Sequence, residues 1–181
     1  MKNAPGAGLF CAAALLAACE REELPQEPPE PPRTARADLL DARGKLVGQA
    51  LFREDERGVW IDLRIADLPP GVHAVHIHET GECRPPEFRS AGDHFNPFGR
   101  KHGLLHPDGP HAGDLPNVTV GEDRRARALL LAPHVTLGPG RHSLLRPGGT
   151  SLVLHEKPDD GTSQPSGDSG GRIACGVIRR D

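Results

Sequence analysis

The stretch that most constrains the fold of this chain is the alternation in "GVWIDLRI", residues 58–65. Val59, Ile61 and Leu63 point to one side of an extended backbone, and the residues between them point to the other. This two-residue period indicates an antiparallel β-strand with one buried face. The 181 residues also include 22 glycines and 19 prolines, which favours short elements joined by turns over long helices. We therefore expect an all-β protein.

Six further segments have the composition of short strands. They are residues 36–41, 45–53, 117–120, 126–131, 150–156 and 172–178. About eight short strands without a convincing helix predict a β-sandwich or a flattened Greek-key barrel. Two long segments rich in glycine and proline, 79–116 and 157–171, interrupt this pattern. Loops of that length inside a compact domain are usually functional.

The first nineteen residues have the composition of an export signal. Lys2 precedes an apolar run of about a dozen residues, which is too short to span a bilayer comfortably. The ending "LAAC" resembles the bacterial lipobox, in which the cysteine is lipidated and the signal is cleaved before it. The alternative is an ordinary signal peptide that ends near an unrelated cysteine. We expect a signal peptide over residues 1–18 and a lipid on Cys19.

A tether is expected between the lipid and the fold. The segment "EREELPQEPPEPPRTAR" is too rich in proline and charge to form a core. The tether therefore covers residues 19–36, and the folded domain covers residues 37–181. Glu20 is not the aspartate that in many Gram-negative bacteria retains a lipoprotein in the inner membrane. We expect the protein on the periplasmic side of the bacterial cell envelope, anchored by lipid to the outer membrane.

The four cysteines have different expected roles, which depend on their position in the chain. Cys11 leaves with the signal and Cys19 carries the lipid, so Cys83 and Cys175 remain. In an oxidising compartment these two are expected to form a disulfide. The alternative is a pair of buried free thiols.

The histidines are arranged as metal ligands. His76 and His78 share one face of an expected strand, and His155 ends a later strand. Four more candidates lie in the long loop: His94, His102, His111 and Asp114. Three histidines with an aspartate suit a tetrahedral zinc site, whereas three or four histidines alone suit copper. For a single histidine the alternative is a residue without metal, which we expect of His106, His134 and His142.

Six motifs in this order carry a resemblance to a known family. They are "HAVHIHETGEC", "SAGDHFNP", "RKHG", "PHAGDLPNVT", "LVLHEK" and "GGRIACGVI". From about residue 37 to 179 the chain resembles copper–zinc superoxide dismutase of the bacterial exported type. The resemblance implies an eight-stranded Greek-key β-barrel of immunoglobulin-like architecture with two long functional loops. It also implies dismutation of superoxide to dioxygen and hydrogen peroxide, with one copper and one zinc per subunit.

The resemblance assigns a role to each matching residue. The implied copper ligands are His76, His78, His94 and His155. The implied zinc ligands are His94, His102, His111 and Asp114, so that His94 bridges the two metals. Asp159 matches an aspartate that hydrogen-bonds ligands of both metals, and Cys83 and Cys175 match the family disulfide. His73 matches a structural histidine outside the metal sites.

The resemblance also implies a mechanism. Copper takes an electron from one superoxide and gives it to a second. The imidazole of His94 leaves the reduced copper, takes up a proton and delivers it to the nascent peroxide. Arg172 matches the family arginine that attracts and orients the anion beside copper. The competing interpretation is a non-catalytic periplasmic copper/zinc-binding lipoprotein, but the presence of every ligand and of Arg172 favours the enzyme.

The charge of the chain limits its other partners. The formal net charge is −3, and no basic block or stripe stands out. A nucleic-acid-binding function is therefore not expected. The expected partners are superoxide as substrate and the membrane through the lipid anchor. A homodimer and a monomer both remain compatible with the sequence.

Overall fold

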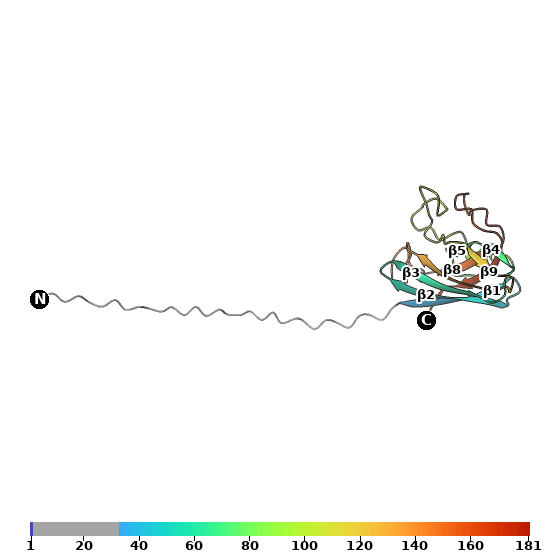
Figure 1. Ribbon diagram of the computed structural model, residues 1–181, viewed down its shortest axis with the longest axis horizontal. Coiled ribbons are helices and arrows are strands. Elements are labelled where there is room, and N and C mark those ends of the chain that lie inside the picture. Colours follow the sequence, from blue (N-terminus) through green and yellow to red (C-terminus); the bar gives the residue numbers. More distant parts are fainter. Residues whose placement is uncertain (2–32) are drawn as a thin grey trace. The chain divides into compact units, whose positions relative to one another are not determined.

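The structure, a computed structural model, describes Met1 and residues 33–181 (Figure 1). The described strands are β1 (Thr34–Asp41), β2 (Leu46–Asp55), β3 (Gly58–Ile65), β4 (Gly71–His73), β5 (Val75–His78), β6 (Val118–Val120), β7 (Ala126–Ala132), β8 (Ser151–His155), β9 (Arg172–Val177) and β10 (Arg179–Arg180). The one helical element in this part is a single turn, η1 (Arg89–Ala91). The expected all-β fold is confirmed.

The alternation that predicts the strand over residues 58–65 does build one face of the core. Val59, Ile61 and Leu63 of β3 are fully buried, while Trp60 and Asp62 lie on the outer face. β3 pairs antiparallel with β2 on one side and β7 on the other. Since the three strands are in register, their inward residues share one apolar cluster.

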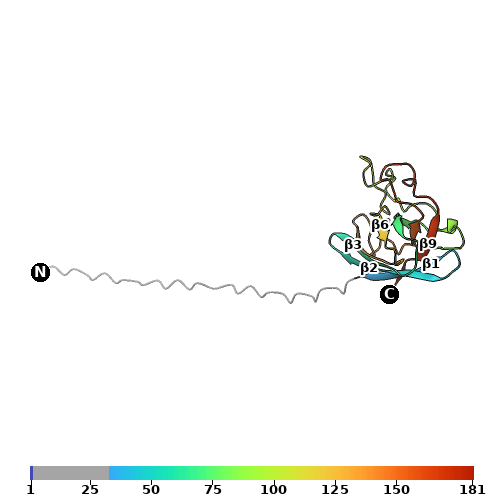
Figure 2. The same ribbon diagram turned by 45° about the vertical axis from the view of Figure 1, so that its right-hand side comes forward.

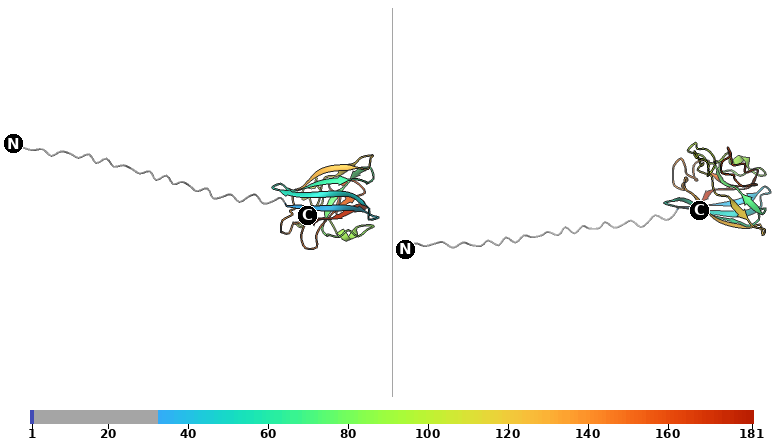
Figure 3. Two further views of the ribbon diagram at one scale, coloured as in Figure 1. Left: turned by 90° about the horizontal axis from the view of Figure 1, so that it is seen from below. Right: turned by 45° about the horizontal axis from the view of Figure 1, so that its top comes forward.

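The main sheet curls into a barrel (Figures 2 and 3). Its strand order is β5-β8-β9-β1-β2-β3-β7, with β10 paired to β1, and β4 and β6 form a separate pair. β4 ends at His73 and β5 begins at Val75. One short stretch of chain therefore pairs first with β6 and then with β8. β6 also lies beside β7, and the β4–β6 pair therefore spans the two edges of the main sheet. Counting β4–β5 as one bent strand and β10 as the end of β9 gives the expected eight strands.

The start of the fold differs from the expected boundary at residue 37. Thr34, Ala35 and Arg36 belong to β1, where they pair with the end of β2. Ala35 and Ala37 are buried between outward-facing neighbours, which is the same two-residue period in small side chains. The tether predicted up to residue 36 thus ends too late, because the preceding prolines obscured this short pattern. The other predicted strands differ by one or two residues at their ends.

Two predictions fall on residues outside the described part of the chain. They are the signal peptide over 1–18 and the lipid on Cys19. Within the described residues, no helix has both the length and the apolar character needed to cross a membrane.

The two long loops lie side by side at one end of the barrel (Figure 1). One joins β5 to β6 and the other joins β8 to β9. They are connected directly, since the Leu105 N–H donates to the Gly161 carbonyl at 3.1 Å. Each loop begins after a strand that ends in histidine. The two histidines and the two loops therefore lie at the same end of the barrel (Figure 1).

A disulfide anchors the start of the first loop to β9. Cys83 and Cys175 are bonded across a sequence separation of 92 residues, which confirms the expected pair. Cys83 packs against a small apolar cluster of Phe88, Ala91, Val153 and Cys175, separate from the main core. Closing a loop of this length stabilises the fold by roughly 4–5 kcal/mol in the chain-entropy account. The disulfide therefore fixes the loop segment that follows Cys83.

Candidate metal centre

Four buried histidines converge where β5 and β8 meet the first loop. Their ring nitrogens lie within 4.8 Å of one another, and the group consists of His76, His78, His94 and His155. His76 and His78 share a face of β5, while Val75 and Ile77 pack into the main core. His155 ends β8, the strand paired with β5. The structure thus brings together the four residues predicted as copper ligands.

The loop joins this group because it runs beside β5. The Ile77 N–H donates to the Gly113 carbonyl at 2.8 Å, and the Phe95 N–H donates to the Ile77 carbonyl at 2.8 Å. This pairing sets His94 opposite His78 and Asp114 opposite His76. A Cβ at Gly113 would collide with the Ile77 carbonyl oxygen. Glycine at this position therefore permits the close approach that places His94 and Asp114.

Each of these histidines directs one ring nitrogen outward to a protein partner. The His78 Nδ1 donates to the Gly92 carbonyl at 3.0 Å, and the His155 Nδ1 shares a hydrogen bond with Ser169 Oγ at 3.2 Å. The His76 Nε2 lies 2.7 Å from Asp159 Oδ2. Such outer contacts fix the orientation of an imidazole ligand.

The other ring nitrogens point inward, and two of them are buried without a protein partner. They are His76 Nδ1 and His94 Nε2. The remaining pair, His78 Nε2 and His155 Nε2, lie 3.3 Å apart. Buried polar atoms are nearly always paired in native proteins. Four converging imidazole nitrogens without adequate partners therefore fit a bound transition metal, and their all-nitrogen donor set suits copper.

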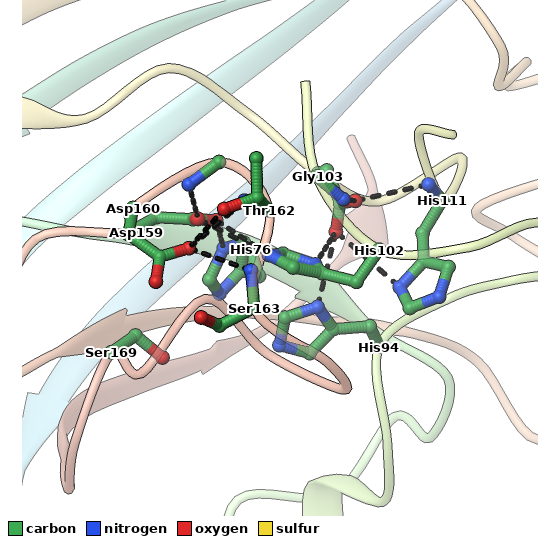
Figure 4. Close-up of polar contacts among 12 residues, drawn as sticks. His76, His94, His102, Gly103, His111, Asp159, Asp160, Thr162, Ser163 and Ser169 are labelled. Atoms are coloured by element: carbon green, nitrogen blue, oxygen red, sulfur yellow. Dashed lines mark hydrogen bonds and ion pairs between the residues drawn. The ribbon is translucent and has the colours of Figure 1, made fainter. Parts of the chain in front are cut away.

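A second group forms around one carboxylate oxygen (Figure 4). Asp114 Oδ1 lies 3.1 Å from His94 Nδ1, 3.0 Å from His102 Nδ1 and 3.5 Å from His111 Nδ1. Ligands of a tetrahedral zinc ion at about 2.0–2.1 Å lie roughly 3.3 Å from one another. The His111 Nδ1 also lacks a hydrogen-bond partner. These four residues, predicted as zinc ligands, thus have the donor set of a zinc site, and their three distances from Asp114 Oδ1 are close to the spacing of zinc ligands.

Backbone groups hold the central carboxylate in place. Asp114 Oδ2 accepts hydrogen bonds from the Gly103 N–H at 2.8 Å and the His111 N–H at 2.9 Å. Its other oxygen, Oδ1, is left to face the three imidazoles. The carboxylate is therefore oriented by the loop itself before any ion is bound.

Asp159 connects the two groups. Its carboxylate reaches the His76 Nε2 at 2.7 Å and the His102 Nε2 at 3.1 Å. The Gly161 N–H donates to the same carboxylate at 2.6 Å, and the side chain of Asn117 bonds the Asp159 backbone. The predicted bridging aspartate thus contacts one member of each group.

Burial sets the charge state of the histidines. Desolvation lowers the pKa of His78 well below its usual value, that of His94 to about 4 and that of His155 to about 3. His102 behaves differently: burial alone lowers its pKa, but hydrogen bonds to Asp114 and Asp159 raise it to about 9. At neutral pH His78, His94 and His155 are therefore neutral imidazoles, as metal binding requires, whereas His102 is protonated.

The predicted anion-binding arginine lines a hollow beside the first group. The hollow is lined by His78, His94, His155 and Arg172, among others. Arg172 Nη1 donates to the Phe88 carbonyl and Nη2 donates to the Gly92 carbonyl, both at 2.7 Å. Gly92 also accepts from His78. One carbonyl in the disulfide-anchored loop thus fixes both the guanidinium and a histidine of the first group.

Several supporting contacts were not predicted from the sequence. The Gly92 carbonyl, Ser169 Oγ and the Gln164 side chain all bond residues of the two groups. A local pattern carries no signal for such long-range contacts. His73 was predicted to be structural, and both of its ring nitrogens lie within 2.9 Å of a backbone carbonyl. The other histidines expected to bind no metal, His106, His134 and His142, lie outside both groups.

The chain is similar to known proteins of one family. The model of the family described as copper/zinc superoxide dismutase (SODC) matches residues 46–178. Superoxide dismutase (Cu-Zn) 2 of Aquifex aeolicus is 52% identical over 147 residues, covering 80% of this chain and 86% of that protein. The superoxide dismutase (Cu-Zn) of Caulobacter vibrioides is 42% identical over 149 residues, covering 81% and 86%. The crystal structure of a SOD-like protein from Bacillus subtilis superimposes with a TM-score of 0.76 at 39% identity, covering 78% of this chain and 96% of that chain.

Proposed function

The chain belongs to the copper/zinc superoxide dismutase family, and we propose which of its residues hold the two metals. Its activity is the dismutation of superoxide to dioxygen and hydrogen peroxide, and its metals are copper and zinc. In the proposal copper is held by His76, His78, His94 and His155. Zinc is held by His94, His102, His111 and Asp114.

One observation carries this assignment. In the part of the chain that the structure describes, four buried side-chain polar atoms have no hydrogen-bond partner, and three of them are His76 Nδ1, His94 Nε2 and His111 Nδ1. They belong to the two groups, and the two nitrogens of His94 face different groups. A cation in each group accounts for all three atoms. His94 then bridges the sites.

The two metals and His94 have different roles in the reaction. Bound copper supplies a one-electron redox couple, and bound zinc supplies a fixed positive charge next to the bridging imidazole. His94 can hold a proton at Nε2 while Asp114 and the loop keep its ring in place. That proton is then available to the peroxide that forms in the hollow. Delivery of the proton from Nε2 thus depends on the contact with Asp114 at Nδ1, which holds the His94 ring in place.

Arg172 binds and orients the substrate anion. Both terminal nitrogens of its guanidinium are tied to backbone carbonyls, so its position in the hollow is fixed. Burial lowers the pKa of Arg172, yet an arginine keeps its charge throughout the accessible pH range. A fixed cation beside the histidine group attracts a small anion and orients it without further ordering cost.

We also propose where the protein is located. We assign residues 1–18 to a signal peptide and Cys19 to lipid attachment, with a tether that ends before Thr34. Export to the periplasmic side of the cell envelope and anchoring in the outer membrane follow from that assignment. The Cys83–Cys175 disulfide supports export, because such bonds persist in oxidising compartments. Mass spectrometry of the membrane-extracted protein tests it: an unmodified chain that still begins before residue 19 contradicts the lipid anchor.

Zinc binding to the metal-free protein is expected to release about one proton at pH 7. His102 binds zinc through Nδ1 and must be neutral to do so, but its pKa is raised to about 9. Zinc affinity should therefore rise with pH up to about 9 and level off above it. Calorimetry in buffers of different ionisation enthalpy measures the proton count. An affinity that is constant between pH 7 and 9 contradicts the role given to His102.

A further inference from the structure

The side chain of Gln164, in the second long loop, hydrogen-bonds the backbone of His102 in the first. Its Oε1 accepts from the His102 N–H at 3.0 Å, and its Nε2 donates to the His102 carbonyl at 2.9 Å. The same Nε2 donates to the Thr162 carbonyl at 2.9 Å. One side-chain amide thus satisfies both backbone polar groups of a residue that is itself fully buried.

No other backbone group in the described part of the chain bonds the N–H or the carbonyl of His102. A buried backbone group that loses its hydrogen-bond partner destabilises the structure around it. Removing the amide of Gln164 therefore destabilises the position of His102. Gln164 itself is an exposed residue, so its replacement leaves no cavity in the core.

The segment that follows Gln164 reaches the hollow beside the first histidine group. Pro165 and Ser166 line that hollow together with His78, His155 and Arg172. The segment is closed on itself, since the Asp160 N–H donates to the Gly167 carbonyl at 3.0 Å and the Gly167 N–H donates to the Ser163 carbonyl at 2.7 Å. The wall of the hollow is thus a closed turn that Gln164 attaches to His102.

We propose that Gln164 is a positioning residue, through which zinc binding at His102 orders the wall of the substrate hollow. The inference rests on the proposed zinc site. Asp159 already links the same loop to the ring of His102, but Gln164 acts on the backbone and lies closer to Pro165. In this proposal bound zinc fixes the position of His102. The backbone of His102 in turn holds the Gln164 side chain, and Gln164 holds the turn from Asp160 to Gly167 in place. By linkage, the order of the turn must in return contribute to zinc affinity.

The test compares the full chain with the variants Gln164→Ala and Gln164→Glu. Gln164→Glu keeps an acceptor for the His102 N–H but loses the donor to its carbonyl. Gln49→Ala is the matched control, because Gln49 is an exposed glutamine on β2 whose side chain hydrogen-bonds Asp38, far from both metal groups in the sequence. Two quantities are measured: the zinc dissociation constant, and amide hydrogen exchange in residues 160–168 with and without zinc.

In the wild type, zinc is expected to slow exchange in residues 160–168 at least about tenfold. In Gln164→Ala the zinc effect on exchange should fall below about twofold, and zinc should bind about tenfold more weakly. Gln164→Glu should show the same changes, and Gln49→Ala should match the wild type. These results support the inference even if one of the two Gln164 variants fails to fold.

Two results overturn the inference. One is a Gln164 variant with wild-type zinc affinity and wild-type zinc-dependent exchange. The other is weaker zinc binding with unchanged zinc-dependent exchange, because the hollow wall then follows zinc without Gln164. If the wild type itself binds no zinc, the proposed zinc site fails, and that failure is separate from either result.

Discussion

Replacement of His155 by alanine is expected to empty the copper site, leave zinc bound and lower the dismutation rate more than about a hundredfold. His155 belongs to the first histidine group and not to the group that contains Asp114. Even the loss of a partner outside the ligand shell costs metal sites about 10–100-fold in affinity or activity. The loss of a ligand should therefore exceed that range for copper alone. Elemental analysis of the loaded variant, together with superoxide decay, measures both effects.

Two further variants make this result specific. His134→Ala is the control, because His134 is exposed and lies outside both groups. Asp114→Asn should show the opposite pattern, with zinc lost first. Equal loss of both metals from His155→Ala contradicts the separation of the two sites, as does unchanged copper content.

Replacement of Arg172 by alanine is expected to lower kcat/KM about ten- to hundredfold without removing either metal. A positive charge focused in a cleft raises association rates by roughly 10–1,000-fold, and Arg172 is the cation fixed beside the first histidine group. The remaining activity should also lose much of its dependence on ionic strength, because salt screens the steering of an anion. Superoxide decay over a range of salt concentrations, with metal content determined in parallel, measures these changes.

Arg172→Lys distinguishes the role of charge from the role of geometry. Lysine keeps the charge but cannot donate to the Phe88 and Gly92 carbonyls in the same forked arrangement. We expect partial recovery of the rate and of its salt dependence. Arg127→Ala is the control, since Arg127 lies on the outer face of β7 and pairs with Asp62. A wild-type rate in Arg172→Ala rules out this role for the arginine.

The parts of the fold that follow from local periodicity could be predicted from the sequence. The alternation around Trp60 gives β3 directly, and the i, i+2 spacing of His76 and His78 places both rings on one face. The loop ligands were assigned by resemblance, because the loop pairing that brings His94 to β5 joins segments far apart in the sequence. Local chemistry therefore identifies ligand types, and the tertiary fold decides which of them meet.

The parts that could not be predicted are those created by the tertiary fold. The division between β4 and β5 at Ala74 arises because one stretch of chain must pair with β6 and then with β8. The Gly92 carbonyl serves both His78 and Arg172, and a carbonyl has no signature in a sequence. Gln164 resembles any other polar loop residue until its contact with His102 is seen.

The most direct test of the account is superoxide decay in the presence of the purified chain loaded with copper and zinc. Superoxide dismutases as a class reach rate constants near the diffusion limit, about 10⁸–10⁹ M⁻¹s⁻¹. We expect a rate in that range for protein that holds one copper and one zinc per chain. His155→Ala, measured in the same assay, is expected to fall to the background rate. A chain that holds both metals and does not accelerate decay above metal-free buffer contradicts the account, because the copper in the first histidine group is then not catalytic.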